Sequence, residues 1–194
     1  MGKRHTRIDV IPEDELTVEQ KTAMKGLLMR CFSDVSQDDV DECFIAQSFA
    51  RVLAYEETKL VGHLRLFERR VVFDGKDVVL GGLGGVCVSE SMRHKNIGTR
   101  LMEEGIRILR EKGCDVACLN TDLKKTASEF YEKIGFRLMN RQVSFEDVHG
   151  RIRYDTGTMF IPICSREIYD HLMDNDKIFH YGKGYWWNTS SDRE

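Results

Sequence analysis

Seven consecutive residues, Arg93 to Thr99, combine basic side chains with the start of a helix. They read Arg-His-Lys-Asn-Ile-Gly-Thr, and the apolar residues after Gly98 recur mostly at three- and four-residue spacing, as in an amphipathic helix. The first N–H groups of a helix lack internal partners and lie at the positive end of its dipole, where phosphates bind. The run therefore predicts an anion-binding loop. Without further context, a solvated basic turn that caps the helix is the better explanation.

The stretch before this loop, Leu80 to Val88, has the pattern of a buried strand that contains four glycines. Glycine weakens a strand and often marks a bulge or the close approach of a ligand to the backbone. We therefore expect the backbone N–H groups of Val86, Cys87 and Val88 to hold an extended ligand. The alternative is an ordinary core strand.

Elements upstream of this strand must position it. A first strand is predicted at Arg7 to Val10, and Thr17 to Gln20 forms a capping-box pattern that starts a helix. A second helix is predicted from Ser36. Two strands follow, from Arg51 to Glu56 and from Leu60 to Phe73, and Asp74-Gly75 then predicts a tight type I′ turn into the glycine-rich strand.

Downstream, the pattern alternates between strand and helix. Gly113 is a plausible helix C-cap, Val116 to Asn120 a short buried strand and Thr126 to Ile134 a helix that Gly135 ends. Phe136 to Leu138 and Gln142 to Phe145 are predicted to form strand, as one bent strand or two, and Thr158 to Ile163 a last strand.

Composition limits the function classes. The 194 residues suit one domain with a sizeable core, expected to span 1–187, with a disordered polar tail at 188–194. The net charge of −3 argues against a nucleic-acid binder that relies on a basic surface, and no apolar run could cross a membrane. The six cysteines form no CxxC pair, which favours reduced, buried thiols in a cytoplasmic protein without a metal site.

The order of elements, with Arg93-x-x-Asn96-x-Gly98-Thr99 at its centre and Tyr131-x-x-x-Gly135-Phe136 downstream, resembles the GNAT superfamily of acetyl-CoA-dependent N-acetyltransferases. The resemblance implies an α+β fold with a mixed, mostly antiparallel central sheet and helices on both faces. Asn96 stands where the family's loop carries glycine. Asparagine tolerates left-handed backbone angles better than other non-glycine residues, so the loop can keep its shape.

The resemblance also implies roles for individual residues. Tyr131 would protonate the leaving thiolate, although a helix tyrosine is more commonly structural. Acetyl-CoA, the implied co-substrate, would be bound by residues of the strand, the loop and two later elements. These are Val86, Cys87, Val88, Arg93, His94, Lys95, Asn96, Ile97, Gly98, Thr99, Asn120 and Ser128, with Arg100 adding positive charge nearby.

Over the chain to Trp187, the sequence is similar to the aminoglycoside 2′-N-acetyltransferases. The shared features are acidic residues after the first helix, the long hairpin with Glu68-Arg69-Arg70, a late Gly157-Thr158-Met159-Phe160 strand and the terminal Gly184-x-x-Trp187. This similarity implies a small cationic acceptor. Its expected contacts are Asp34, Asp38, Asp39 and Asp155, which would form an acidic rim, and Trp187, which would stack on the acceptor. A solvated helix start explains the first three equally well.

The general base and the acceptor stay open. His63 in the hairpin is one candidate base; a water chain to an acidic residue is another, and a site that lowers the pKa of the amine would need no strong base. The leading hypothesis is transfer of an acetyl group to a primary amine, with an aminoglycoside 2′-amine as one candidate. The alternatives are a polyamine, metabolite or protein amine, or a CoA-binding module without catalysis. A homodimer is compatible with each.

Overall fold

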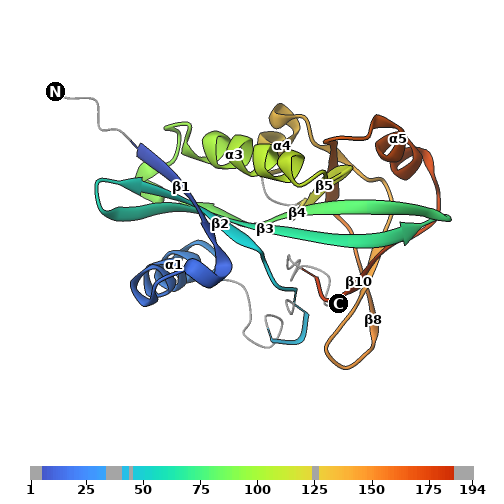
Figure 1. Cartoon of the computed structure of the whole chain (residues 1–194), viewed down its shortest axis with the longest axis horizontal. Helices are drawn as coiled ribbons and strands as arrows, with labels where there is room; N and C mark the ends of the chain where they lie inside the picture. Colours follow the sequence, from blue (N-terminus) through green and yellow to red (C-terminus); the bar gives the residue numbers. More distant parts are fainter. Residues whose placement is uncertain (1–5, 34–40, 44–45, 124–126, 186–194) are drawn as a thin grey trace.

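A computed structural model describes residues 6–33, 41–43, 46–123 and 127–185. The described part is an α+β fold around a seven-stranded sheet in the order β1-β2-β3-β4-β5-β9-β6 (Figure 1). Every neighbouring pair is antiparallel except β4 and β5. The expected mixed, mostly antiparallel sheet is confirmed. The strands are β1 Thr6–Pro12, β2 Ala50–Glu56, β3 Lys59–Phe73, β4 Lys76–Val88, β5 Val116–Asn120, β6 Arg137–Leu138 and β9 Thr158–Pro162.

The hairpin of β3 and β4 runs through the middle of the molecule. Asp74 and Gly75 at its tip both have positive φ, 48° and 77°, as the predicted type I′ turn requires. Phe73 pairs with Lys76 directly beside the turn, so the turn fixes the register of the whole hairpin. This register places Arg65 opposite Gly84 and His63 opposite Cys87.

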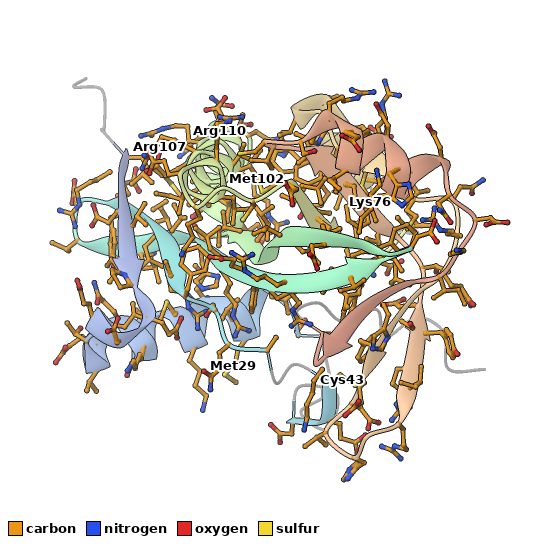
Figure 2. The ribbon with its side chains drawn as sticks, turned by 45° about the vertical axis from the view of Figure 1, so that its right-hand side comes forward. Met29, Cys43, Lys76, Met102, Arg107 and Arg110 are labelled. Carbon is orange, nitrogen blue, oxygen red and sulfur yellow. The ribbon has the colours of Figure 1, made fainter. Side chains whose placement is uncertain are left out.

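Helices cover both faces of the sheet, as expected. Figure 1 shows α1 (Val18–Cys31) on one face, and α3 (Ile97–Glu111), α4 (Ala127–Ile134) and α5 (Arg166–Asp174) on the other. The capping box at Thr17 and Gln20 is present and starts α1. Met102 of α3 is fully buried, while Arg107 and Arg110 lie on the outer side of the helix (Figure 2). Gly105 allows α3 to approach closely, because a Cβ there would lie 2.7 Å from Leu64 Cδ2. Short 3-10 turns, Glu13–Glu15 and Glu90–Met92, precede α1 and α3.

A second, three-stranded sheet follows the order β10-β7-β8, with β7 Val143–Glu146, β8 Ile152–Asp155 and β10 Phe179–Lys183. The idea that Phe136–Leu138 and Gln142–Phe145 form one bent strand is therefore wrong: β6 pairs with β9, whereas β7 pairs with β8 and β10. The sequence interpretation also missed α5, β8 and β10. Arg69 on β3 joins the two sheets by donating to the backbone oxygens of Tyr181 at 2.6 Å and Gly184 at 3.0 Å.

Candidate active site

Strands β4 and β5 separate in the middle of the sheet. They pair only from Leu80↔Val116 to Gly82↔Cys118, although β4 continues to Val88 and β5 to Asn120. Beyond Gly82, β4 pairs with β3 alone among the described residues. Backbone N–H and C=O groups alternate between the two edges of a strand, so about half of those between Leu83 and Val88 point to the open edge. This edge can hold an extended chain with amide groups, as the glycine-rich sequence predicted.

The residues expected at this edge, Val86, Cys87 and Val88, divide between the two faces. Val86 and Val88 pack against the core beneath α3, and Cys87 packs with Cys31 against the core beneath α1. Any ligand held by this backbone thus lies between two apolar layers.

The loop from Arg93 to Thr99 leads from β4 into α3. Asn96 is the N-cap residue of α3 and has left-handed angles, φ 61° and ψ 13°, and His94 also has φ 61°. Asn96 therefore adopts the conformation for which the family uses glycine. Its side chain does not cap the helix, and the first helical hydrogen bond runs from Arg100 N to Asn96 O. The N–H groups of Ile97, Gly98 and Thr99 precede that bond and are donors for an anion.

Gly98 lets the start of α3 contact α4. A Cβ at Gly98 would lie 3.2 Å from Phe130 Cζ, closer than side chains usually pack. The neighbouring Arg93, His94 and Lys95 are exposed, and the arginine and the lysine supply positive charge, although Lys95 Nζ also lies 3.3 Å from Met92 Sδ. Arg100 is instead engaged with β1, because its Nη1 donates to Thr6 O at 3.0 Å.

A bulge at Gly85 lies within the open edge of β4. Gly85 has φ 58°, and the register between β3 and β4 shifts between His63 and Arg65. The ring nitrogen Nδ1 of His63 lies 2.8 Å from Gly85 O, and Nε2 lies 3.1 Å from Arg51 Nη1. A carbonyl can only accept and a guanidinium can only donate, so His63 carries its proton on Nδ1 and accepts at Nε2.

This arrangement excludes His63 as the general base. The side chain is fully buried, and burial lowers its pKa to about 3, helped by the positive charge of Arg51 and Arg65. Its one basic nitrogen already accepts a hydrogen bond from Arg51. Arg51 is fixed in turn by Glu13, with Nε to Oε2 at 2.6 Å and Nη2 to Oε1 at 2.8 Å. His63 is therefore a structural residue that holds the Gly85 bulge.

Tyr131 of α4 faces the core near the open edge of β4. Its side chain is 6% exposed, and its ring packs edge-on against Phe130 and Phe136, with centroids 5.2 and 6.2 Å away. Burial raises the pKa of its hydroxyl, and the nearby Cys87 thiol adds to the rise. Tyr131 thus stays protonated at neutral pH, as a proton donor must.

Asn120 lies at the end of β5, across the gap from β4. Its Nδ2 donates to Asp155 Oδ2 at 3.1 Å and Thr156 O at 3.0 Å, and also contacts the Tyr185 hydroxyl. Its Oδ1 is buried and has no hydrogen-bond partner within the described part of the chain. A buried carbonyl oxygen without a partner is costly, so this atom is suited to accept from a ligand N–H.

Comparison with known proteins identifies the family. A model described as "Acetyltransferase (GNAT) domain" matches residues 14–139. The chain belongs to the GNAT acetyltransferase family. It is also 30% identical over 95 residues to N-alpha-acetyltransferase 30 of Xenopus laevis, a match that covers 48% of this chain and only 31% of the frog protein.

Solved structures of other GNAT proteins share the fold. Escherichia coli ElaA superposes with a TM-score of 0.58 at 20% identity, covering 80% of this chain and 99% of ElaA. The aminoglycoside N-acetyltransferase AAC(6')-Iy in complex with CoA gives 0.55 at 20% identity, covering 73% and 95%. A GNAT acetyltransferase from Brucella melitensis in complex with acetyl-CoA gives 0.53 at 18% identity, covering 82% and 88%.

Of the acceptor residues expected for this GNAT protein, the structure describes only Asp155. Asp34, Asp38, Asp39 and Trp187 lie outside the described residues. Asp155 is only 7% exposed, and its oxygens accept from Asn120 and from the backbone N–H of Thr156. Its carboxylate thus stabilises the end of β8 beneath Asn120, which corrects its expected place in an exposed rim. Ser128 is half-buried in the first turn of α4.

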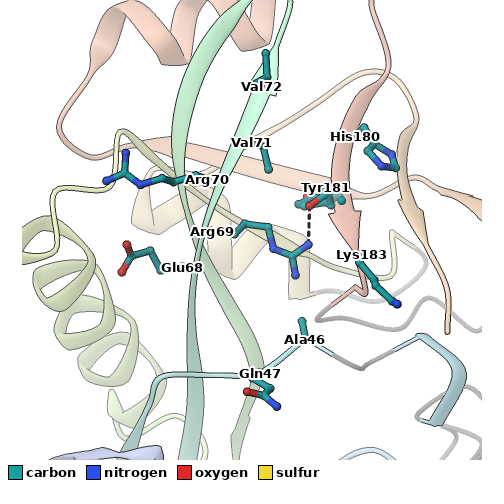
Figure 3. A pocket seen from close by; sticks show the side chains of 11 residues that line it. Ala46, Gln47, Glu68, Arg69, Arg70, Val71, Val72, His180, Tyr181 and Lys183 are labelled. Carbon is teal, nitrogen blue, oxygen red and sulfur yellow. Dashed lines mark hydrogen bonds between the residues drawn. The ribbon is translucent and has the colours of Figure 1, made fainter. Parts of the chain in front are cut away.

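A cavity of about 650 Å³ lies between β3 and β10, away from the open edge of β4 (Figure 3). Its lining includes Ala46, Arg69, Tyr181 and Lys183. Figure 3 shows Arg69 pointing to Tyr181 and Arg70 leaving β3 in the opposite direction.

Of the described helices, none is long and apolar enough to cross a membrane.

Sequence reasoning also missed a positive charge on the β3 face that carries His63. Arg65 follows His63 by two residues, so both side chains point to that face. The alternation His63-Leu64-Arg65-Leu66-Phe67 was a usable signal, because it places two basic residues and an aromatic residue on one face.

Proposed function

We propose that this protein transfers the acetyl group of acetyl-CoA to an amine. The observation that carries the proposal is the open edge of β4 beside the start of α3, whose N-cap residue Asn96 makes no side-chain capping hydrogen bond. An extended pantetheine arm fits a strand edge with free amide groups, and a pyrophosphate fits a helix start.

The residues present suit acetyl-CoA. Backbone groups from Val86 to Val88 would pair with the pantetheine arm, and Asn120 Oδ1 would accept from one of its amide N–H groups. Ile97, Gly98 and Thr99 would donate backbone N–H groups to the pyrophosphate. Arg93, His94 and Lys95 would attract the remaining phosphate charge. Ser128 lies three residues before Tyr131, so both are on the same side of α4, and Ser128 would be a further polar contact for acetyl-CoA. When bound, acetyl-CoA supplies an activated acetyl thioester.

Tyr131 is the proposed acid. In the reaction, the amine nitrogen forms a bond to the acetyl carbon, the bond from that carbon to sulfur breaks, and Tyr131 gives its hydroxyl proton to the leaving sulfur. Burial raises the pKa of Tyr131, so the hydroxyl is protonated at neutral pH before the reaction begins. The same rise makes it a weaker acid, so the proton must be transferred as the bond to sulfur breaks.

The amine must lose a proton, and His63 cannot take it. We propose that the acceptor amine enters neutral, and that the proton it releases on forming the amide passes through water to Tyr131, which replaces the proton given to the sulfur. An environment that disfavours charge lowers the pKa of a bound amine, and the apolar layers on both sides of β4 provide one.

The acceptor class is the finer part of the proposal. The similarity to aminoglycoside 2′-N-acetyltransferases favours a small cationic amine, with an aminoglycoside as one member. The match to an N-alpha-acetyltransferase favours a protein or peptide amine equally. If the protein is instead a CoA-binding module without catalysis, we expect it to bind acetyl-CoA and to acetylate no amine.

Release of free thiol from acetyl-CoA tests the proposal. The protein is incubated with aminoglycosides, polyamines, amino acids and short peptides, and the acetylated product is identified by mass spectrometry. We expect amine-dependent thiol release with at least one class. Saturable binding of acetyl-CoA without turnover on any amine would instead establish the module.

A further inference from the structure

Arg65 is a basic side chain that forms no ion pair with a carboxylate of the described residues, although the charge of Glu13 acts on it from a distance. Its Nε atom is inaccessible to solvent and finds no acceptor within the described residues. By contrast, Arg51, directly opposite on β2, is paired with Glu13. Burial lowers the pKa of Arg65 to about 10, and the charge of Arg51 adds to the effect. A charge held in this way is costly unless a partner arrives.

The charges around Arg65 do not balance. The face holds two guanidinium groups, Arg51 and Arg65, and one carboxylate, Glu13, since His63 is neutral. Glu13 is fully used, because its two oxygens accept from Arg51 and from Ser48 Oγ at 2.6 Å. Within the described part of the chain, the guanidinium of Arg65 also lies over the ring of Phe67, with Cζ 4.9 Å from the ring centroid. Among the residues that the structure describes, this cluster therefore has one positive charge more than its carboxylates balance.

Arg65 lies close to the place where the reaction would occur. It pairs with Gly84 across the hairpin, and its Cδ lies 3.5 Å from where a Cβ of Gly85 would be. Gly84 offers no side chain that could neutralise it. Val86, at the open edge, is two residues further, at most about 7 Å because the Gly85 bulge shortens the strand here. That span suits a small molecule with its anionic group at one end and its amine at the other.

We propose that the acceptor is an amine that carries a carboxylate, and that Arg65 binds this carboxylate. The proposal rests on the proposed acetyltransferase function and replaces its cationic acceptor with an anionic one. A planar guanidinium can hold a carboxylate through two parallel hydrogen bonds. Binding would balance the additional positive charge of the cluster, so the carboxylate is recognised where a neutral amide is not.

The test compares matched acceptors. Amino acids and dipeptides are each supplied as the free acid and as the C-terminal amide, and kcat/KM is measured for both. We expect the wild-type protein to prefer the acids by about 10- to 100-fold, the range for a hydrogen-bonded charge. Free amino acids and dipeptides are measured separately, and the class with the higher kcat/KM shows whether the carboxylate belongs to a free amino acid or to a peptide.

Variants assign the preference to Arg65. Arg65→Gln should reduce the ratio of acid to amide to about one through a higher KM for the acid, with the KM for acetyl-CoA unchanged, and Arg65→Lys should restore part of it. Arg70→Gln is the matched control, because Arg70 is exposed on the same strand and points away from this face. The wild-type measurements need no folded variant and already decide the central claim.

Three outcomes overturn the proposal. Equal turnover of acids and amides by the wild-type protein, or preferred turnover of cationic amines, removes the anionic acceptor and leaves the acetyltransferase function intact. An acid preference that survives in Arg65→Gln moves the carboxylate site elsewhere. Absence of turnover with every amine removes the proposed function, and this inference with it.

Discussion

The loop from Arg93 to Thr99 and the β3 face that carries His63 and Arg65 obtain their chemistry from the chain in different ways. The loop consists of consecutive residues, and its proposed donors are backbone N–H groups. Its shape depends on local properties, above all on the left-handed angles of His94 and Asn96. Such a site is encoded in one short stretch of sequence.

The β3 face is assembled from distant parts of the chain. Glu13 precedes α1, Arg51 lies on β2, His63 and Arg65 lie on β3, and Gly85 lies on β4. Only the pairing of three strands brings these residues together. Its chemistry depends on the balance of charges among buried side chains, so one unmatched residue changes what the face can bind. The proposed cofactor side is thus defined by backbone shape and the proposed acceptor side by charge.

The largest expected effect comes from Gly98→Glu, which disrupts the loop. The new side chain would collide with Phe130, whose Cζ lies 3.2 Å from the Cβ position, and would place a negative charge at the proposed pyrophosphate site. We expect loss of the acetyl-CoA-dependent rise in melting temperature, which arises because a ligand binds only the folded state. Gly98→Ala is the control: it adds the steric contact without the charge and should keep weaker binding. Unchanged affinity in Gly98→Glu would show that the loop does not bind CoA.

The same contrast explains what could be predicted from the sequence. Local signals were sufficient where structure is local: the capping box at Thr17, the turn at Asp74-Gly75 and the helix after Asn96 are all confirmed. Helix α5 also had a local signal that was missed, because Ser165 caps it by accepting from Ile168 N and Tyr169 and Leu172 form its buried side.

Long-range pairing could not be predicted in this way. β6 is two residues long, and nothing near it in sequence indicates that it joins β9 while β7 joins β8 and β10. The partners β9 and β10 come later in the chain. Which sheet each strand joins is therefore set by long-range pairing and register, not by local strand propensity. His63 as a candidate base failed for the same reason, because its partners Arg51 and Gly85 are found only in the folded hairpin.

Tyr131→Phe tests whether catalysis depends on a side chain between these two regions. The variant keeps the ring contacts with Phe130 and Phe136 and removes one hydroxyl. If Tyr131 is the acid, kcat should fall by about 100-fold or more. The KM for acetyl-CoA should stay unchanged, because the loop and the β4 edge are intact. The measurement is thiol release at saturating acetyl-CoA, with the melting temperature as a check of folding. A kcat within about twofold of wild type would make Tyr131 a structural residue.

The smallest expected effect concerns the charge balance of the β3 face. His63 has a pKa of about 3 in the folded protein against an ordinary value of 6.5, because its buried ring is kept neutral. Below pH 6.5 the unfolded chain therefore binds a proton that the folded protein does not, and the free energy of unfolding decreases as pH falls. The full slope is about 1.4 kcal/mol per pH unit, so the loss between pH 6.5 and 5 is about 1.5 kcal/mol. Carboxylates with lowered pKa values also reduce stability when they become protonated, but this occurs mainly below pH 5. The contribution of His63 can therefore be measured between pH 6.5 and 5.

His63→Gln should remove this slope while lowering stability at pH 7, since glutamine does not titrate and fits the Gly85 bulge less well. Urea unfolding at pH 7, 6 and 5 measures the slope in the wild-type protein and the variant. His149→Gln is the matched control, because His149 is an exposed histidine with 59% of its side chain accessible, and it should retain the wild-type slope. An identical slope in His63→Gln and wild type would mean that the pKa of His63 is the same in the folded and unfolded protein. The face would then carry a titratable charge instead of a fixed one, and Arg65 would have a neighbour whose charge changes with pH. The contrast between a cofactor side defined by shape and an acceptor side defined by fixed charge would fail at that residue.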